Sequence, residues 1–403
     1  MKNKKFSFST LITLIILAVA LAISVTMMIA MRYFNRQVNA VTQKQALYTH
    51  INDLDTKVRT YYNSIDEEQL RSALAAGYVN ALSDPYAQYF TPDEYQRALL
   101  KRKGQAAGVG LHVREAAENQ LIVESVDADS AASKAGLMPQ DILAAVNGEG
   151  VSASDCERVQ QICDTSTEKI TLSVLRDGKT LAFELTAYTY AVKSVHEQML
   201  NDTVGYIRIS AFYDNTLGQF KAAYSSLENS GATSFVFDVR GCSGGGSRSS
   251  LEGILAYLLP HGAYASYVSS NGTAENLVAN DSHEMSVPSV TLVNEETIGE
   301  AELFAGILQE FSMTTTVGQK TVGKGKLQDF IPLKDNNAAL LLTVGEITLM
   351  RTGSIERIGI MPSMAVPLDA DKKAKLGNLP VAEDDQLQAA LTTFSTNVLN
   401  TAT

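Results

Sequence analysis

Cysteine and histidine are scarce in this chain of 403 residues, which argues against two common kinds of site. The three cysteines, Cys156, Cys163 and Cys242, are an odd number and include no Cys-x-x-Cys pair, so neither a disulfide framework nor a zinc site is indicated. The five histidines form no His-Glu-x-x-His motif. We therefore expect free thiols, no metal and no other cofactor.

Positive charge is also in short supply. Lysine and arginine number 33 against 44 aspartates and glutamates, which leaves a net charge of −11. A surface that binds phosphates needs clustered basic side chains, and because no such cluster occurs we expect no nucleic-acid partner. With 45% hydrophobic and 19% charged residues, the composition is that of a globular protein rather than a disordered or multi-span one. The length predicts two or more domains.

A long uncharged apolar stretch, Leu11 to Met31, lies near the amino terminus. As a helix it would be about 30 Å long, which matches the hydrocarbon core of a bilayer. We expect residues 1–36 to form a cytoplasmic tip and a single-pass anchor in the cell membrane, with the bulk of the chain extracytoplasmic. A cleaved signal peptide is the alternative, but the run is longer than such peptides need. Basic residues flank both ends and orient it only modestly: Lys2, Lys4, Lys5, Arg32 and Arg36.

The remaining chain divides by its pattern of apolar residues into four parts. Residues 37–103 repeat apolar side chains at helical spacing, and Thr91-Pro92 supplies a cap and a first-turn proline for one helix. Residues 104–186 consist of short strand-like segments and turns. Residues 187–369 alternate strand-like and helix-like runs, which predicts helices packed over a largely parallel sheet. Residues 370–403 form a tail with a helix. The fold class is therefore multidomain α/β.

Glycines mark a candidate peptide-binding loop at the start of the β-rich region. Gly108-Val109-Gly110-Leu111 precedes a strand, and Ala135-Gly136-Leu137-Met138-Pro139-Gln140-Asp141-Ile142-Leu143 follows, with Val146-Asn147-Gly148 after it. Together these segments resemble a PDZ domain. The resemblance implies that backbone N–H groups from Gly108 to Leu111 bind a terminal carboxylate while the peptide adds as a strand to the sheet edge. Protein or peptide carboxyl termini are then the expected partners.

Four further motifs resemble the C-terminal processing peptidases of family S41. They are Ser83-Asp84-Pro85-Tyr86, Val204-Gly205-Tyr206-Ile207-Arg208-Ile209, Phe237-Asp238-Val239-Arg240-Gly241-Cys242-Ser243-Gly244-Gly245 and Val322-Gly323-Lys324-Gly325-Lys326-Leu327-Gln328. With the PDZ segment they cover residues 50–395. The resemblance implies a crotonase/ClpP-like α/β core and a serine-type endopeptidase with a Ser–Lys dyad that cuts near the carboxyl terminus of proteins.

The same resemblance implies roles for individual residues. Lys324 takes the position of the general base, which must be neutral to accept a proton from serine, and Gln328 takes that of its orienting partner. Gly244 and Gly245 take positions in the oxyanion-hole region.

The match fails at the nucleophile. Family members carry a serine in the segment that here reads Val293-Asn294-Glu295-Glu296-Thr297-Ile298-Gly299-Glu300-Ala301-Glu302, and alignment without gaps places Gly299 at that serine. The next residue, small in the family, contributes an oxyanion-hole N–H and here is Glu300, whose charge would oppose an oxyanion. An aspartate near the end of the family's core is replaced by Ser363. Three departures together point to relaxed or redirected function.

Three functions remain open from the sequence. The first is a pseudoprotease that binds carboxyl-terminal tails, in which Glu300 forms an ion pair with Lys324. The second is an active endopeptidase that uses Thr297 or Ser243 as the nucleophile. The third is a regulatory partner of an active paralogue, which could also assemble as a homo-oligomer.

Overall fold

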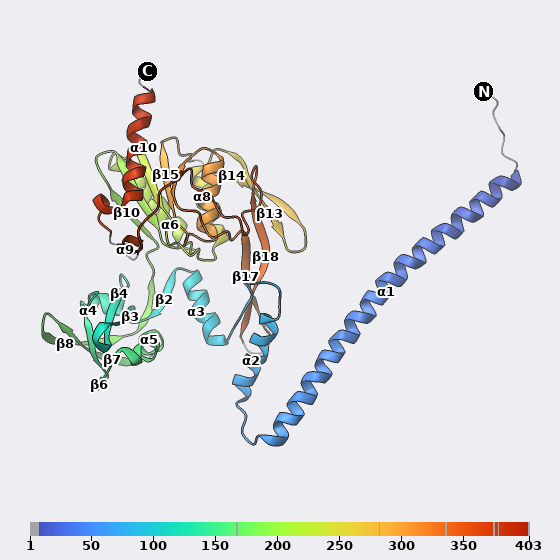
Figure 1. The fold of residues 1–403 in the computed structure, drawn as a ribbon, viewed down its shortest axis with the longest axis horizontal. Helices are drawn as coiled ribbons and strands as arrows, with labels where there is room; N and C mark the ends of the chain where they lie inside the picture. Colours follow the sequence, from blue (N-terminus) through green and yellow to red (C-terminus); the bar gives the residue numbers. More distant parts are fainter. Residues whose placement is uncertain are drawn as a thin grey trace. The chain divides into compact units, whose positions relative to one another are not determined.

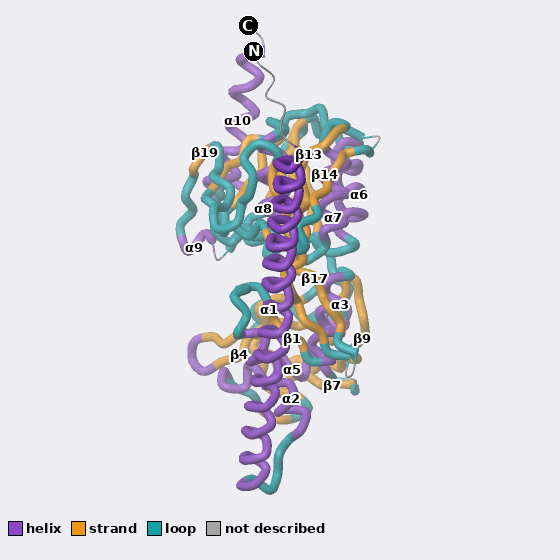
Figure 2. Tube along the Cα trace, turned by 90° about the vertical axis from the view of Figure 1, so that its right-hand side faces the viewer, coloured by secondary structure: helices purple, strands orange, loops and turns teal. Residues whose placement is uncertain are grey.

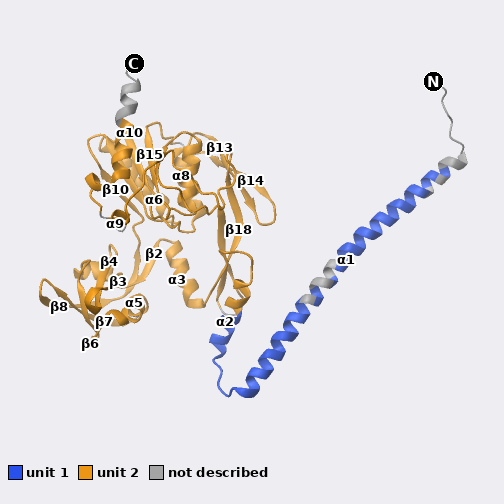
Figure 3. Cartoon of the chain, viewed as in Figure 1, with its two compact units in different colours: residues 1–74 blue, residues 75–403 orange. Residues whose placement is uncertain are grey.

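The computed structural model describes residues 8–401 except 167, 282, 335, 336, 374 and 378. The chain divides into two compact units, residues 1–74 and 75–403 (Figure 3). The basic residues Lys2, Lys4 and Lys5, considered above for membrane orientation, lie outside the described residues. Each unit is described by itself below.

The first unit is dominated by a single helix. The helix α1 (Phe8–Tyr61) runs for 54 residues, without a break at the boundary expected near residue 36, and α2 (Glu67–Asn80) begins in this unit. The stretch Leu17–Asn35 within α1 is long and apolar enough to cross a membrane, and its side chains are not buried in protein. A helix of this kind near the amino terminus is compatible with a signal sequence or an anchor.

The second unit opens with the strand β1 (Gln88–Phe90) and the helix α3 (Pro92–Arg102). The start of α3 confirms the expected cap: Glu94 N–H donates to Thr91 Oγ1 at 3.4 Å, and Thr91 N–H donates to Glu94 Oε2 at 2.8 Å. Pro92 occupies the first turn, where its missing N–H has no cost.

A small β-rich domain follows α3 (Figure 1). Its sheet has the strand order β3-β4-β5-β7-β8, with β6 paired to β5. Its strands are β3 (Leu111–Ala116), β4 (Gln120–Val126), β5 (Ile142–Val146), β6 (Glu149–Gly150), β7 (Lys169–Arg176) and β8 (Lys179–Thr186). Its helices are η1 (Ala117–Asn119), α4 (Ala131–Ala135), η2 (Ala153–Asp155) and α5 (Cys156–Thr165). The domain is entered by β2 (Gln105–Gly108) and left by β9 (Tyr188–Ala191), which pair antiparallel.

The α/β core is built on a six-stranded sheet of order β10-β11-β12-β15-β16-β19. All pairs are parallel except β10 with β11, so the expected largely parallel sheet is confirmed. The strands are β10 (Val195–Met199), β11 (Val204–Ile209), β12 (Ser234–Asp238), β15 (Ser289–Val293), β16 (Thr315–Gly318) and β19 (Met364–Ala365).

Helices cover both faces of this sheet (Figures 1 and 2). On one face, Phe237 packs with buried residues of α6 (Thr216–Asn229), α7 (Arg248–Leu258) and α8 (Glu300–Glu310). On the other face, Val236 packs with Leu387 of α10 (Asp385–Thr401). Neighbouring residues of one strand thus serve opposite layers, which accounts for the continuous apolar run of a central parallel strand. The short helices α9 (Ala370–Lys373) and η3 (Val381–Glu383) precede α10.

A second sheet flanks the core. It has the order β1-β18-β13-β14, with β17 paired to β18. Its remaining strands are β13 (Gly262–Ser269), β14 (Ala274–Ala279), β17 (Lys326–Pro332) and β18 (Ala339–Leu349). Because β1 pairs with β18, the segment around Tyr86 is brought beside the loop that carries Lys324.

Candidate active site

Gly299 lies where the chain turns from β15 into α8. Its backbone has φ 66° and ψ −121°, a left-handed conformation that strains residues with a side chain. A Cβ atom at this position would lie 3.9 Å from Lys324 Cδ, an ordinary van der Waals contact. Position 299, where the sequence predicts the nucleophile of the family to align, therefore has space for a side chain on the side of Lys324.

The side chain of Glu302 links the backbone at Gly299 to the backbone at Lys324. Its Oε2 accepts Gly299 N–H at 3.0 Å and Lys324 N–H at 2.8 Å, and its Oε1 accepts Gly323 N–H at 2.6 Å. The carboxylate is fully buried, so these charge-assisted hydrogen bonds offset its desolvation. In the sequence, Glu302 was used only to align the segment with the family. Its place three residues after Gly299, in the first turn of α8, is the feature that indicates a capping role.

The Lys324 side chain extends over an aromatic ring. Its Nζ atom lies 5.1 Å from the centroid of the Tyr86 ring, whose hydroxyl donates to Glu356 Oε1 at 3.0 Å. Burial, followed by the hydrogen bond to Glu356, raises the pKa of Tyr86 to about 12. A ring face stabilises a charged ammonium, whereas a general base must be neutral. Sequence reasoning included Tyr86 in a motif but gave it no role.

The loop after β12 holds Gly244 and Gly245 against two other segments. A Cβ atom at Gly245 would lie 2.4 Å from the Phe212 carbonyl oxygen, and one at Gly244 would lie 2.4 Å from Glu300 Oε2. Position 245 therefore requires glycine because backbone atoms of Phe212 leave no room for a Cβ atom, and position 244 favours glycine because its φ is 81°. The second contact places the carboxyl group of Glu300 directly on the loop that would form an oxyanion hole.

Glu300 is buried at this loop. Burial raises the pKa of its carboxyl, and the N–H groups of Glu300, Gly246 and Gly245, together with the charge of Lys324, act in the opposite direction without cancelling it. The expected ion pair with Lys324 is wrong: no contact between their charged groups within 4 Å occurs among the described residues. The reason is that the lysine ammonium lies over Tyr86 while the carboxyl turns to the glycine loop.

Gln328 lies on β17 and lines the same cavity as Lys324, Glu300 and the glycine loop, a space of about 330 Å³. Its amide donates to Lys326 O at 3.2 Å and to Thr343 Oγ1 at 3.4 Å. These contacts orient Gln328 itself; the part of the chain that the structure describes shows no hydrogen bond from it to Lys324.

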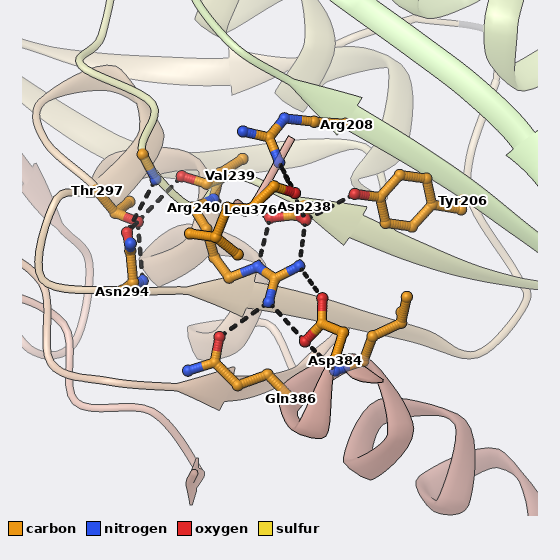
Figure 4. Close-up of polar contacts among 12 residues, drawn as sticks. Tyr206, Arg208, Asp238, Val239, Arg240, Asn294, Thr297, Leu376, Asp384 and Gln386 are labelled. Atoms are coloured by element: carbon orange, nitrogen blue, oxygen red, sulfur yellow. Dashed lines mark hydrogen bonds and ion pairs between the residues drawn. The ribbon is translucent and has the colours of Figure 1, made fainter. Parts of the chain in front are cut away.

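The two alternative nucleophiles differ in their surroundings. Thr297 is fully buried, and its hydroxyl donates to Val239 O at 3.0 Å and accepts Asn294 N–H at 3.0 Å (Figure 4). This hydroxyl stabilises the turn and does not line the cavity. Ser243 is exposed and does line the cavity with Lys324.

A buried charge network lies at the end of β12, shortly before the glycine loop in the sequence (Figure 4). The guanidinium of Arg240 contacts Asp238 at 2.6 Å and Asp384 at 2.7 Å, and it donates to Gln386 Oε1 at 2.9 Å. Asp238 also accepts the Tyr206 hydroxyl at 2.7 Å. The network joins the end of β12 to the start of α10, so the carboxyl-terminal segment helps to fix the loop.

Ser363, which replaces the family's aspartate, lies in a hydrogen-bonded turn. Its N–H donates to Thr316 Oγ1 at 2.8 Å, and its hydroxyl accepts from the Gln309 amide at 3.2 Å. No group of three or more His, Cys, Asp or Glu side chains that could hold a metal occurs within the described residues.

In the β-rich domain, Gly108 and Gly110 have φ values of 123° and 71°. These angles require glycine and shape the loop expected to bind a carboxylate. Val109 N–H, one of the expected donors, already donates to Cys163 O of α5 at 2.9 Å. Leu111 begins β3, which is the terminal strand of its sheet.

The fold defines a class of protein in which a PDZ domain is joined to an α/β peptidase core. Residues 98–175 match the PDZ domain model, and residues 203–366 match the model of peptidase family S41. The chain belongs to the S41 family of carboxyl-terminal processing proteases.

Relatives and a solved structure support this assignment. A carboxyl-terminal-processing protease of Synechocystis sp. is 30% identical over 318 residues, which cover 77% of this chain and 73% of that protein. The carboxy-terminal processing protease CtpA of Bacillus subtilis is 27% identical over 329 residues, 79% of this chain and 70% of that one. A solved S41-family structure from Bacteroides fragilis, 18% identical, has a TM-score of 0.53 over 72% of this chain and 83% of its own, and it shows the likeness of fold.

Proposed function

We propose that this chain is an S41 peptidase homologue without peptidase activity, which binds protein carboxyl-terminal tails through its PDZ domain. The observation that carries the proposal is Gly299: the backbone position that faces Lys324 has no side chain and therefore no nucleophile. The buried carboxyl of Glu300 on the glycine loop supports it, because this carboxyl already takes up N–H groups of Gly245 and Gly246 that would otherwise be directed at an oxyanion.

Incubation of the full-length protein with β-casein, an unstructured substrate, tests the loss of activity. We expect no cleavage by the unaltered chain. Cleavage that Lys324→Ala abolishes would overturn the proposal, whereas cleavage that Lys324→Ala leaves unchanged would identify a contaminating protease.

Binding of tails is tested with one fluorescent peptide prepared as a free acid and as an amide. Free-acid peptides should bind at least ten-fold more tightly, because the loop that contains Val109 and Gly110 would offer its N–H groups to a carboxylate. Equal affinity for the two forms would mean that the loop does not read a terminal carboxylate.

A second candidate function is an active endopeptidase that uses Ser243. The observation in its favour is that Ser243 lines the same cavity as Lys324. The matched variants are Ser243→Ala and Ser247→Ala, since Ser247 lies four residues further on and instead donates its hydroxyl to Asp214 at 2.7 Å. Activity lost in the first variant alone would support this candidate.

We also propose that α1 anchors the protein in the cell membrane, with the bulk of the chain outside the cytoplasm. The apolar stretch Leu17–Asn35, without buried side chains, supports an anchor. Alkaline carbonate extraction of membranes should leave the full-length chain in the pellet. Release of a shortened chain into the soluble fraction would instead identify the stretch as a cleaved signal.

A further inference from the structure

The edge of the PDZ sheet that would receive a peptide is occupied by a side chain of the protein itself. The strand β3 pairs with β4 on one side only, and α5 packs along its other edge. On that edge Val113 N–H donates to Gln160 Oε1 at 3.0 Å, and Gln160 Nε2 donates to Leu111 O at 3.1 Å. A strand added to β3 would need these same two backbone groups.

The chemistry of Gln160 suits this position. A primary amide carries one carbonyl acceptor and N–H donors, so it can serve a strand edge as a peptide group does. The second N–H of Gln160 Nε2 is directed to Asp164 Oδ1 at 2.9 Å, one turn further along α5. The carbonyl oxygen and both N–H groups of the Gln160 amide therefore have hydrogen-bond partners, which fixes the orientation of the amide beside β3.

The same helix also covers the loop from Gly108 to Leu111, which is expected to bind a carboxylate. Val109 N–H donates to Cys163 O at 2.9 Å, and a Cβ atom at Gly108 would lie 2.6 Å from that oxygen. Helix α5 therefore covers both the free edge of β3 and the Val109 N–H of the glycine loop.

We propose that Gln160 is a built-in competitor for the peptide strand and thereby sets the affinity of the PDZ groove for carboxyl-terminal tails. The proposal rests on the peptide-binding function proposed above and adds its regulation. A peptide binds only when the Gln160 amide has left Leu111 and Val113, so the apparent Kd is the intrinsic Kd divided by the open fraction. Two hydrogen bonds of ordinary net strength hold the open fraction to roughly one tenth or less.

The test uses the full-length protein in detergent and a fluorescent decapeptide that ends in two alanines with a free carboxylate. Gln160→Ala should lower the Kd about ten-fold. Gln160→Glu keeps an acceptor for Val113 but loses the donor to Leu111, so it should lower the Kd by a smaller factor. Gln161→Ala is the matched control, because Gln161 is exposed on the same helix; it should leave the Kd unchanged.

Backbone hydrogen exchange at Val113 separates the competitor from the peptide-binding function. In Gln160→Ala this amide loses its acceptor and should exchange at least ten-fold faster, with or without peptide-binding activity. Unchanged exchange would overturn the proposal, and so would faster exchange with an unchanged Kd. Faster exchange with no peptide bound by any variant would uphold the occupied edge and overturn the function on which it rests. Circular dichroism melts of the variants and the control check that the domain remains folded.

Discussion

Replacement of Gly299 by serine restores the missing hydroxyl but strains the backbone. At φ 66° and ψ −121° a residue with a Cβ atom is unfavourable by about 1–3 kcal/mol. Space does not add to this cost, since the new Cβ would contact only Lys324 Cδ at 3.9 Å. We expect Gly299→Ser to lower the free energy of unfolding by that amount. Gly299→Ala is the matched control, because it carries the same strain without the hydroxyl.

The activity of Gly299→Ser should be weak at best. The Lys324 ammonium is directed at the Tyr86 ring, 5.1 Å from its centroid, and the Glu300 carboxyl lies on the loop that would stabilise an oxyanion. One oxyanion-hole donor contributes about 10²–10³ in kcat, so removing the Glu300 carboxyl from the glycine loop should raise kcat. We expect Gly299→Ser with Glu300→Ala to cleave at least ten-fold faster than Gly299→Ser alone.

Urea unfolding followed by circular dichroism measures the strain, since the chain has no tryptophan for fluorescence. Release of fluorescent peptides from labelled casein measures the activity. Two results would refute the reasoning. If the serine and alanine variants both unfold at the same urea concentration as the unaltered protein, the backbone at Gly299 is not left-handed. If Gly299→Ser alone is fully active, Glu300 does not obstruct the loop.

Three other changes test separate parts of the structure. Burial raises the pKa of the Glu300 carboxyl above its unfolded value of about 4.3, so the folded state holds an extra proton between the two pKa values and the free energy of unfolding falls as the pH rises through that range. Glu300→Gln should remove this fall, measured by urea titrations at pH 4 and 7.5. A fall of the same size in the variant would contradict the burial. Arg240→Met should destabilise the core by about 3–5 kcal/mol, because Asp238 and Asp384 lose their buried partner; a loss below about 1 kcal/mol would contradict the network. Thr297→Val should cost about 1–3 kcal/mol by leaving buried backbone groups without partners, whereas unchanged stability would mean that the hydroxyl is free.

Helices and strands were predictable where residues close in the sequence determine them. The cap formed by Thr91 and Glu94 involves residues three apart, and the alternation of strands and helices after residue 187 is sufficient to predict a parallel sheet. Pairings between distant segments were not predictable. Gln88 of β1 lies opposite Leu341 of β18, and no periodicity in either segment indicates the other.

The candidate site shows the same division. The family motifs singled out Gly299 and Lys324, and a Cβ atom at position 299 would lie 3.9 Å from Lys324 Cδ. The direction of the Glu300 side chain was not predictable, because opposite charges suggested an ion pair while the nearby Gly245 and Gly246 N–H groups offered another environment. The role of Gln160 was also invisible, since a glutamine on a helix gives no sign of which strand edge lies beside it.

The changes at positions 299 and 300 have a common physical logic. In a serine peptidase, the N–H groups of an oxyanion hole are directed at a negative charge that develops only when the serine attacks. If no serine attacks at this site, as we propose, no such charge forms there, and the N–H groups of the loop around Gly244 lack that partner. Glu300 supplies a permanent acceptor at that place, at the cost of burying a carboxyl whose pKa is raised by desolvation. A glycine at position 299 and an acid at position 300 are therefore consistent with the proposed loss of activity, and we expect high activity only when both positions are changed.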